Sequence, residues 1–294
     1  MQVPQLTEIT TRDNIIHQGI YYKPSQASKR ALLWIHGLTS TYYNNQKLQN
    51  QIIQICEQKA WGFAAFNNRG HDIVTGIKKI DPQTPTGFSR LNGGSGYENF
   101  ADCIFDIEAS INFLASQGYT QMVLIGYSTG ANKACFYGGS QKHPNLIGVI
   151  LVSPTSDRLF PSLNRDLLKK DLMKIEKLIY QGKGDELVLT NGYFPMTPKR
   201  FVSLYSPHSL EDVFDYGDET AKLTYFSRIN KPLLVLLGDV DESLDRPAQE
   251  VISVFNKFQK SVNYTSKIIS NGSHSYEDKE AEVTKIIIDW ITQL

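Results

Sequence analysis

A serine, an aspartate and a histidine in this chain have the types and the order needed for nucleophilic catalysis. Ser128 lies in Gly126-Tyr127-Ser128-Thr129-Gly130, which fits the pattern G-x-S-x-G. A serine hydroxyl is a poor nucleophile at neutral pH and needs a base to accept its proton. His274 could be that base, and Asp241 could fix the imidazole tautomer and stabilise the imidazolium. This set predicts acyl transfer through a covalent intermediate on Ser128.

Each of these side chains follows a predicted strand. Predicted strands precede all three catalytic candidates, at residues 122–125, 231–237 and 264–270, and the first is a short apolar run typical of a buried parallel strand. A helix is predicted directly after Ser128. Because the carboxyl ends of parallel strands lie at one edge of a sheet, residues far apart in sequence are expected to converge there.

The acidic member of the set has alternatives. Asp239 lies two residues nearer the strand end than Asp241, and Asp245 lies just beyond it. Asp157, which follows the preceding strand, is a further geometric option. We prefer Asp241 because it stands three residues after Gly238. This strand–Gly-x-x-Asp spacing is the one used in the fold that these motifs together resemble.

A second turn could supply the donors that stabilise an oxyanion. The apolar run 31–35 predicts a buried strand that ends in His36-Gly37. A backbone N–H just past such a turn can act together with the N–H that follows the nucleophile. Here those donors would be Leu38 and Thr129. The alternative interpretation is a tight turn whose histidine is hydrogen-bonded to the backbone.

The strand–helix alternation is interrupted once. Residues 158–230 combine a helical pattern with many aromatic residues, and we interpret them as a cap inserted into a core formed by residues 1–157 and 231–294. Residues 72–96 are rich in proline and glycine and predict a loop.

Composition excludes several classes of protein. The 294 residues contain 30 Lys and Arg and 30 Asp and Glu, so charge gives no reason to expect binding to nucleic acid or to an anionic membrane. No apolar run approaches the roughly 20 residues of a membrane span. Cys56, Cys103 and Cys135 fit no redox or zinc motif and predict reduced, buried thiols in a cytoplasmic protein. No metal or organic cofactor is implied.

The motifs around Gly37, Ser128, Asp241 and His274 resemble those of the α/β-hydrolase superfamily from about residue 15 to the end. The resemblance implies an α/β-hydrolase fold, with a mostly parallel central sheet flanked by helices and an inserted, mainly helical cap. The segments 66–70 and 195–204 are similar to a family that includes fungal siderophore ester hydrolases, which implies carboxylic ester hydrolysis. The turn after His36 departs from the longer His-Gly-Gly-Gly motif of some lipases and esterases.

The sequence therefore predicts a serine hydrolase that cleaves a small-to-medium carboxylic ester. The same three residues could hydrolyse an amide, a thioester or a carbon–carbon bond, because the pocket and not the triad selects the leaving group. An alternative from another class is a ligand receptor that uses the hydrolase fold and retains residual turnover. Substrate-binding residues and oligomeric state are not predicted.

Overall fold

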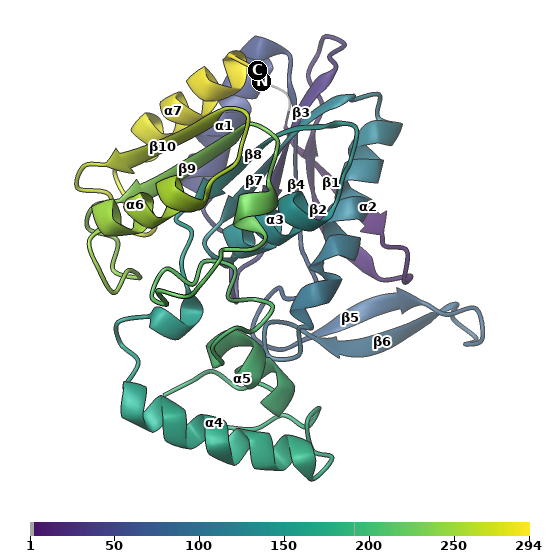
Figure 1. The fold of residues 1–294 in the computed structure, drawn as a ribbon. Coiled ribbons are helices and arrows are strands. Elements are labelled where there is room, and N and C mark those ends of the chain that lie inside the picture. Colours follow the sequence, from purple (N-terminus) through teal and green to yellow (C-terminus); the bar gives the residue numbers. More distant parts are fainter. Residues whose placement is uncertain (1–2, 191) are drawn as a thin grey trace.

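The computed structural model describes residues 3–190 and 192–294, and its main sheet within these ranges contains eight strands (Figure 1). Their spatial order is β1 (Gln5–Thr10), β2 (Ile16–Tyr22), β4 (Gly62–Phe66), β3 (Arg30–Ile35), β7 (Gln121–Tyr127), β8 (Leu146–Val152), β9 (Leu233–Gly238) and β10 (Tyr264–Ile269). Strand β2 pairs antiparallel with both β1 and β4. All pairs from β4 to β10 are parallel. The predicted fold class, a mostly parallel sheet flanked by helices, is confirmed.

Helices cover both faces of the sheet. One face packs against α2 (Cys103–Ser116), α3 (Thr129–Ser140) and α6 (Ala248–Phe258), and the other against α1 (Gln46–Lys59) and α7 (Glu280–Thr292). Figure 1 shows α1 beside α7. Strand β3 illustrates the arrangement, because Leu33 faces the first cluster of apolar side chains and Leu32 the second. Burial on both faces explains why the central strands are continuous apolar runs.

The segment between β8 and β9 has its own apolar cluster. Helices α4 (Arg165–Tyr180) and α5 (Pro198–Tyr205) lie beyond one edge of the sheet (Figure 1). Their shared core contains Leu168, Ile175, Met196, Phe201, Leu204 and Tyr205. Thr197 caps α5 by accepting the N–H of Arg200 at 3.2 Å, and Pro198 occupies the first turn, where its missing N–H costs nothing. Short 3₁₀ helices occur at η1 (Phe100–Asp102), η2 (Asp157–Leu159) and η3 (Phe226–Arg228).

The prediction of a loop over residues 72–96 is wrong. This segment contains an antiparallel hairpin, β5 (Thr75–Ile80) and β6 (Phe88–Gly93). Its prolines lie in the connecting turn, and Gly93 leaves room for the buried side chain of Ile77 on the opposite strand. Gly76 and Gly93, whose residue type favours a loop, are thus paired within the hairpin.

Two other sequence-based expectations concern thiols and membranes. Cys56, Cys103 and Cys135 are free and buried, and burial raises the pKa of each thiol, so all three stay protonated. Among the described residues, none of the helices combines the length and the apolar character required to cross a lipid bilayer.

Candidate active site

Ser128 lies in a strained turn between β7 and α3. Its backbone angles are φ 56° and ψ −128°, in a region that L-residues rarely adopt. The turn is possible because a Cβ is absent at two glycines. A Cβ on Gly126 would lie 2.2 Å from the carbonyl oxygen of Gly130, and one on Gly130 would lie 2.2 Å from that of Ile35. The serine is therefore held at the carboxyl end of β7.

The hydroxyl of Ser128 contacts the imidazole of His274. Ser128 Oγ lies 2.9 Å from His274 Nε2. On the other side of the ring, His274 Nδ1 lies 2.9 Å from Oδ1 and 3.0 Å from Oδ2 of Asp241. With its proton on Nδ1, the imidazole donates to Asp241 and accepts from Ser128. The structure thus brings together the three side chains that the sequence predicts to converge.

The main chain of His274 is held by residues that sequence analysis did not identify. Its N–H donates to Glu242 Oε2 at 3.0 Å. Its carbonyl oxygen accepts hydrogen bonds from the hydroxyl groups of Tyr127 and Ser153, each at 3.0 Å. Burial raises the pKa of Tyr127 to about 12, so the phenol remains a neutral donor. Glu242 and Tyr127 are sequence neighbours of predicted site residues and could have been suspected, whereas nothing in the sequence marks Ser153.

Among the acids considered near β9, Asp241 is the one that contacts the imidazole. Its side chain is buried, and Oδ1 also accepts the N–H of Ser243 at 2.9 Å. Asp239 is exposed. Asp245 instead pairs with Arg246 at 3.0 Å. The carboxylate geometry therefore agrees with the preference for Asp241.

The turn predicted to contribute to an oxyanion hole lies against the serine. A Cβ on Gly37 would lie 2.9 Å from Cβ and 3.3 Å from Oγ of Ser128, so the backbone of the turn is in contact with the nucleophile. Leu38 and Thr129 both line the pocket that contains Ser128. Thr129 is also the first residue of α3, and the first N–H groups of a helix have no intrahelical partner. This placement is compatible with the predicted pair of donors.

His36 supports this turn as a neutral histidine. Its Nδ1 lies 2.9 Å from the carbonyl oxygen of Gly37, and its Nε2 accepts the N–H of Asn68 at 3.0 Å. Burial, together with the nearby charge of Lys133, lowers the pKa of His36 to about 3. His36 is therefore not a base for Ser128.

The pocket beside Ser128 has a volume of about 500 Å³. The core of the fold contributes Ser128, His274 and the polar residues around them. The segment between β8 and β9 contributes a largely aromatic wall that includes Phe160, Leu163, Tyr193, Phe194 and Tyr205. Asp157 also lines the pocket. Such a cavity can enclose a partly apolar small molecule next to the nucleophile.

A buried ionic network connects α3 to α5. Glu98 Oε1 lies 2.5 Å from Lys133 Nζ, and Glu98 Oε2 lies 3.2 Å from Arg200 Nη2. Arg200 also forms an ion pair with Glu211. All four side chains are at most 2% exposed, and their charges sum to zero. Sequence analysis missed this network.

The same network reaches the turn beside the serine. Arg200 Nε donates to the carbonyl oxygen of Ser95 at 2.8 Å. The hydroxyl of Ser95 accepts the N–H of Thr39 at 2.7 Å. Since Thr39 directly follows Leu38, helix α5 is fixed to the backbone that carries one of the predicted oxyanion donors.

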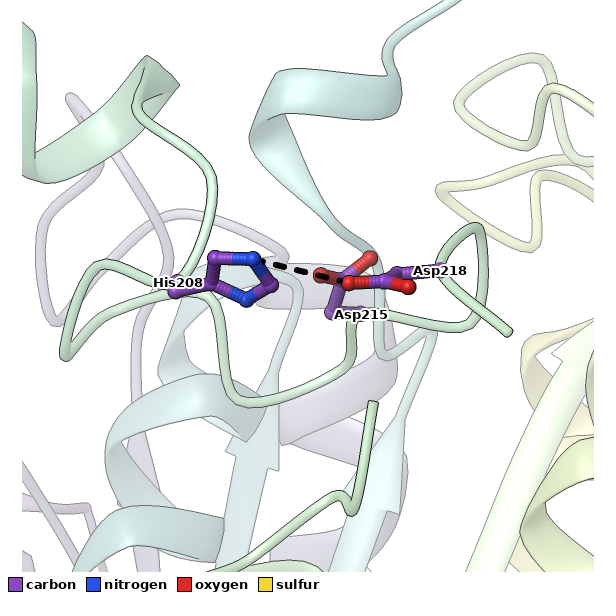
Figure 2. A group of neighbouring side chains, drawn as sticks. All are labelled: His208, Asp215 and Asp218. Carbon is purple, nitrogen blue, oxygen red and sulfur yellow. Dashed lines mark ion pairs between the residues drawn. The ribbon is translucent and has the colours of Figure 1, made fainter. Parts of the chain in front are cut away.

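His208, Asp215 and Asp218 form a separate group of side chains (Figure 2). One ligand atom from each lies within 4.8 Å of the others, and His208 Nε2 lies 3.6 Å from Asp218 Oδ2. Asp215 is also paired with Arg158, and Asp218 accepts the hydroxyl and N–H of Thr220. Because a guanidinium already neutralises Asp215 and the His208 side chain is 69% exposed, we assign no metal ion to this group.

Known proteins share the fold and part of the sequence. A protein of Mycoplasma pneumoniae with the provisional name esterase/lipase 2 is 22% identical over 266 residues, which are 88% of this chain and 87% of the relative. The siderophore hydrolase EstB from Aspergillus fumigatus has a similar structure, with a TM-score of 0.68, 17% identity and 98% coverage of both chains. The esterase Pf2001 from Pyrococcus furiosus gives a TM-score of 0.63 and 18% identity, covering 99% of this chain and 91% of its own. At these identities the structural likeness is one of fold.

A family model extends the comparison to the residues of the site. The model, described as a protein of unknown function (DUF1749), matches residues 88–294, well over half of the chain. The matched region contains Ser128, Asp241 and His274, and also α4 and α5. The earlier residues supply the remaining strands and the turn at Gly37. The chain belongs to the DUF1749 family, and its fold is that of the α/β-hydrolase superfamily.

Proposed function

We propose that this protein is a serine hydrolase that cleaves small-to-medium carboxylic esters through an acyl-enzyme on Ser128. The observation that carries the proposal is the continuous hydrogen-bonded chain from Ser128 Oγ through His274 to Asp241 at the wall of a pocket. The relatives named as esterases and as a siderophore hydrolase favour an ester over an amide, a thioester or a carbon–carbon bond.

In the acylation step, His274 Nε2 accepts the proton of Ser128 while Oγ attacks the ester carbonyl carbon. The carboxylate of Asp241 stabilises the imidazolium that forms. The negative charge on the carbonyl oxygen is stabilised by the N–H groups of Leu38 and Thr129, and by the positive end of the α3 dipole. Backbone N–H groups are held in place by the fold, so donors of this kind need little reorganisation when the charge develops.

Collapse of the tetrahedral intermediate expels the alcohol, which takes the proton from His274. Water then enters, His274 removes a proton from it, and the resulting nucleophile attacks the acyl-enzyme. A second tetrahedral intermediate releases the carboxylic acid and returns the proton to Ser128. The same base and the same oxyanion donors therefore serve both halves of the reaction.

We further propose that residues 158–230 act as a cap on the core formed by residues 1–157 and 231–294. The aromatic side chains of this segment supply one wall of the pocket, whereas the core supplies the reacting groups. A volume of about 500 Å³ suits a small-to-medium acyl or alcohol group rather than a long acyl chain lying fully inside.

The experiment is labelling and turnover with a matched serine variant. A fluorophosphonate probe is expected to label Ser128, and Ser128→Ala should lower kcat for p-nitrophenyl butyrate by at least about a thousandfold. The control is Ser116→Ala, because Ser116 is exposed and its hydroxyl bonds only locally, donating to the carbonyl oxygen of Phe113 and accepting from the side chain of Gln117. Full activity in Ser128→Ala, with the fold verified by circular dichroism, would refute the proposal.

A further inference from the structure

Asp157 is an acidic residue of the pocket to which the triad gives no role. It is the first residue of η2 and lines the same cavity as Ser128 and His274. The imidazole, however, contacts Asp241 through both carboxylate oxygens. Asp157 thus faces the space in which the substrate would lie, without taking part in the chain of proton transfers.

The carboxyl group of Asp157 has unused hydrogen-bonding capacity. Within the described part of the chain, its side chain makes no hydrogen bond, and its Oδ2 is buried without a partner. Asp241, by contrast, accepts hydrogen bonds from Ser243 and His274. A carboxylate that accepts no N–H is poorly stabilised, and a buried polar group of this kind is normally paired. A group in the pocket could bond to Oδ1, the carboxyl oxygen that is not enclosed, whereas Oδ2 has no accessible surface.

The charges around Asp157 do not favour its ionised form. Burial and the charge of Glu211 outweigh the nearby Arg200 and raise the pKa of Asp157 to about 8. Arg200 is itself engaged by two carboxylates. The other titratable groups around it and across the pocket include Lys133, Tyr193, Tyr205, Asp212, Glu242 and His274. At neutral pH the carboxyl group is mostly protonated and can donate a hydrogen bond.

We propose that Asp157 recognises the substrate through a hydrogen bond to an uncharged carbonyl oxygen that lies away from the scissile ester bond. The inference rests on the proposed hydrolase function and deepens it. It predicts a preference for esters that carry a second carbonyl group over alkyl esters of the same shape, because the latter leave the carboxyl group of Asp157 unpaired within the complex.

The test uses pairs of substrates that differ in one oxygen atom. One series consists of p-nitrophenyl esters of acids with a ketone at successive chain positions, each matched with the ester in which a methyl branch replaces the ketone oxygen. A second series places the same pair of groups in the alcohol part of butyrate esters. The quantity measured is the ratio of kcat/KM for the keto ester to kcat/KM for its branched partner.

The variants separate hydrogen bonding from packing. For the best-placed ketone, Asp157→Leu is expected to lower the ratio by about tenfold, because only the keto ester loses a hydrogen bond in this variant. Asp157→Asn keeps an N–H donor of similar size and is expected to keep most of the preference. A wild-type ratio that is the same at every ketone position, or an unchanged ratio in Asp157→Leu, would overturn the proposal.

The pH dependence of the ratio in the wild-type enzyme provides a second test, which does not depend on the folding of any variant. Above about pH 8 the carboxyl group of Asp157 ionises, stops donating and repels a carbonyl oxygen. The wild-type ratio should therefore fall as pH rises through this value, whereas the ratio for Asp157→Asn should stay constant. A pH-independent wild-type ratio contradicts the role of Asp157. Absence of all ester turnover, together with no labelling of Ser128, would instead refute the hydrolase function.

Discussion

Replacement of Glu98 by glutamine tests whether the buried ionic network holds the fold together. Glu98 contacts both Lys133 and Arg200, and its side chain has no exposed surface. Glu98→Gln keeps the size of the side chain but removes its charge. Arg200 retains Glu211, whereas Lys133 loses its carboxylate partner and, among the described residues, keeps the uncharged side-chain oxygen of Asn68 at 3.0 Å. The variant therefore leaves one uncompensated positive charge inside the protein.

The expected loss follows from that charge count. Breaking a buried ion pair by removing one partner costs about 3–5 kcal/mol, because the remaining ion is desolvated without compensation. A domain is typically stable by only about 5–15 kcal/mol. The double variant Glu98→Gln/Lys133→Met restores neutrality and is expected to be more stable than Glu98→Gln alone, by about 1–3 kcal/mol.

The free energy of unfolding is measured by urea denaturation, followed by both tryptophan fluorescence and circular dichroism so that two-state behaviour is verified. The control is Lys285→Gln, which removes an ion pair of 2.5 Å to Asp289 on the surface, where the lysine side chain is 76% exposed. It should cost less than about 1 kcal/mol. The reasoning is wrong if Glu98→Gln loses no more stability than this control, or if the double variant is no more stable than the single one.

Two further predictions concern the turn at Gly37 and the stability of the protein at acidic pH. Gly37→Ala places a Cβ 2.9 Å from Cβ of Ser128, so kcat should fall by about a hundredfold, whereas Gly76→Ala in the β5–β6 hairpin makes only ordinary contacts and should leave kcat unchanged. Burial opposes the ionisation of Asp106, but the nearby His17 and Arg69 outweigh burial and hold the pKa of Asp106 below its ordinary value of 3.8. The carboxylate of Asp106 therefore binds a proton less readily in the folded protein than in the unfolded chain. Ionised Asp106 therefore makes its full contribution to the free energy of unfolding above about pH 4, and this contribution is lost as the pH falls below about 4. The melting temperature should drop there in the wild type and drop less in Asp106→Asn; equal drops would contradict this assignment.

The strands and the turn that carry the nucleophile were predictable because each signal is local. The run before Gly126, the two glycines and the helix that follows are contiguous, and together they allow only a sharp strand-to-helix turn. The meeting of Ser128 with His274 followed from one nonlocal rule, that the carboxyl ends of parallel strands share an edge. No knowledge of side-chain packing was required for this step.

The parts that sequence analysis missed depend on contacts between distant segments. Lys133 lies on α3, and a lysine on a helix is usually solvent-exposed, so nothing in its neighbourhood indicates that it is buried against Glu98. Arg200 similarly lies within a short amphipathic helix. The hairpin at residues 75–93 was missed because its glycines mimic a loop, and its register depends on Ile77 packing into the space that Gly93 leaves. Such features emerge only when the fold brings the partners together.

The segment between β8 and β9 makes two kinds of contact. One kind joins it to the core, and the other lines the pocket. Arg200 joins α5 to the core through fully buried charges, and through Ser95 it also fixes the turn at Thr39. A change at Arg200 would therefore disturb the fold together with the turn at residues 36–39. Asp157 and Phe160, by contrast, line the cavity without belonging to this network. Substitutions there can alter which ligand is bound while the reacting groups stay in place. Specificity in this protein should therefore be found in the pocket wall, to which α5 contributes Tyr205, and not in the ionic network around Arg200.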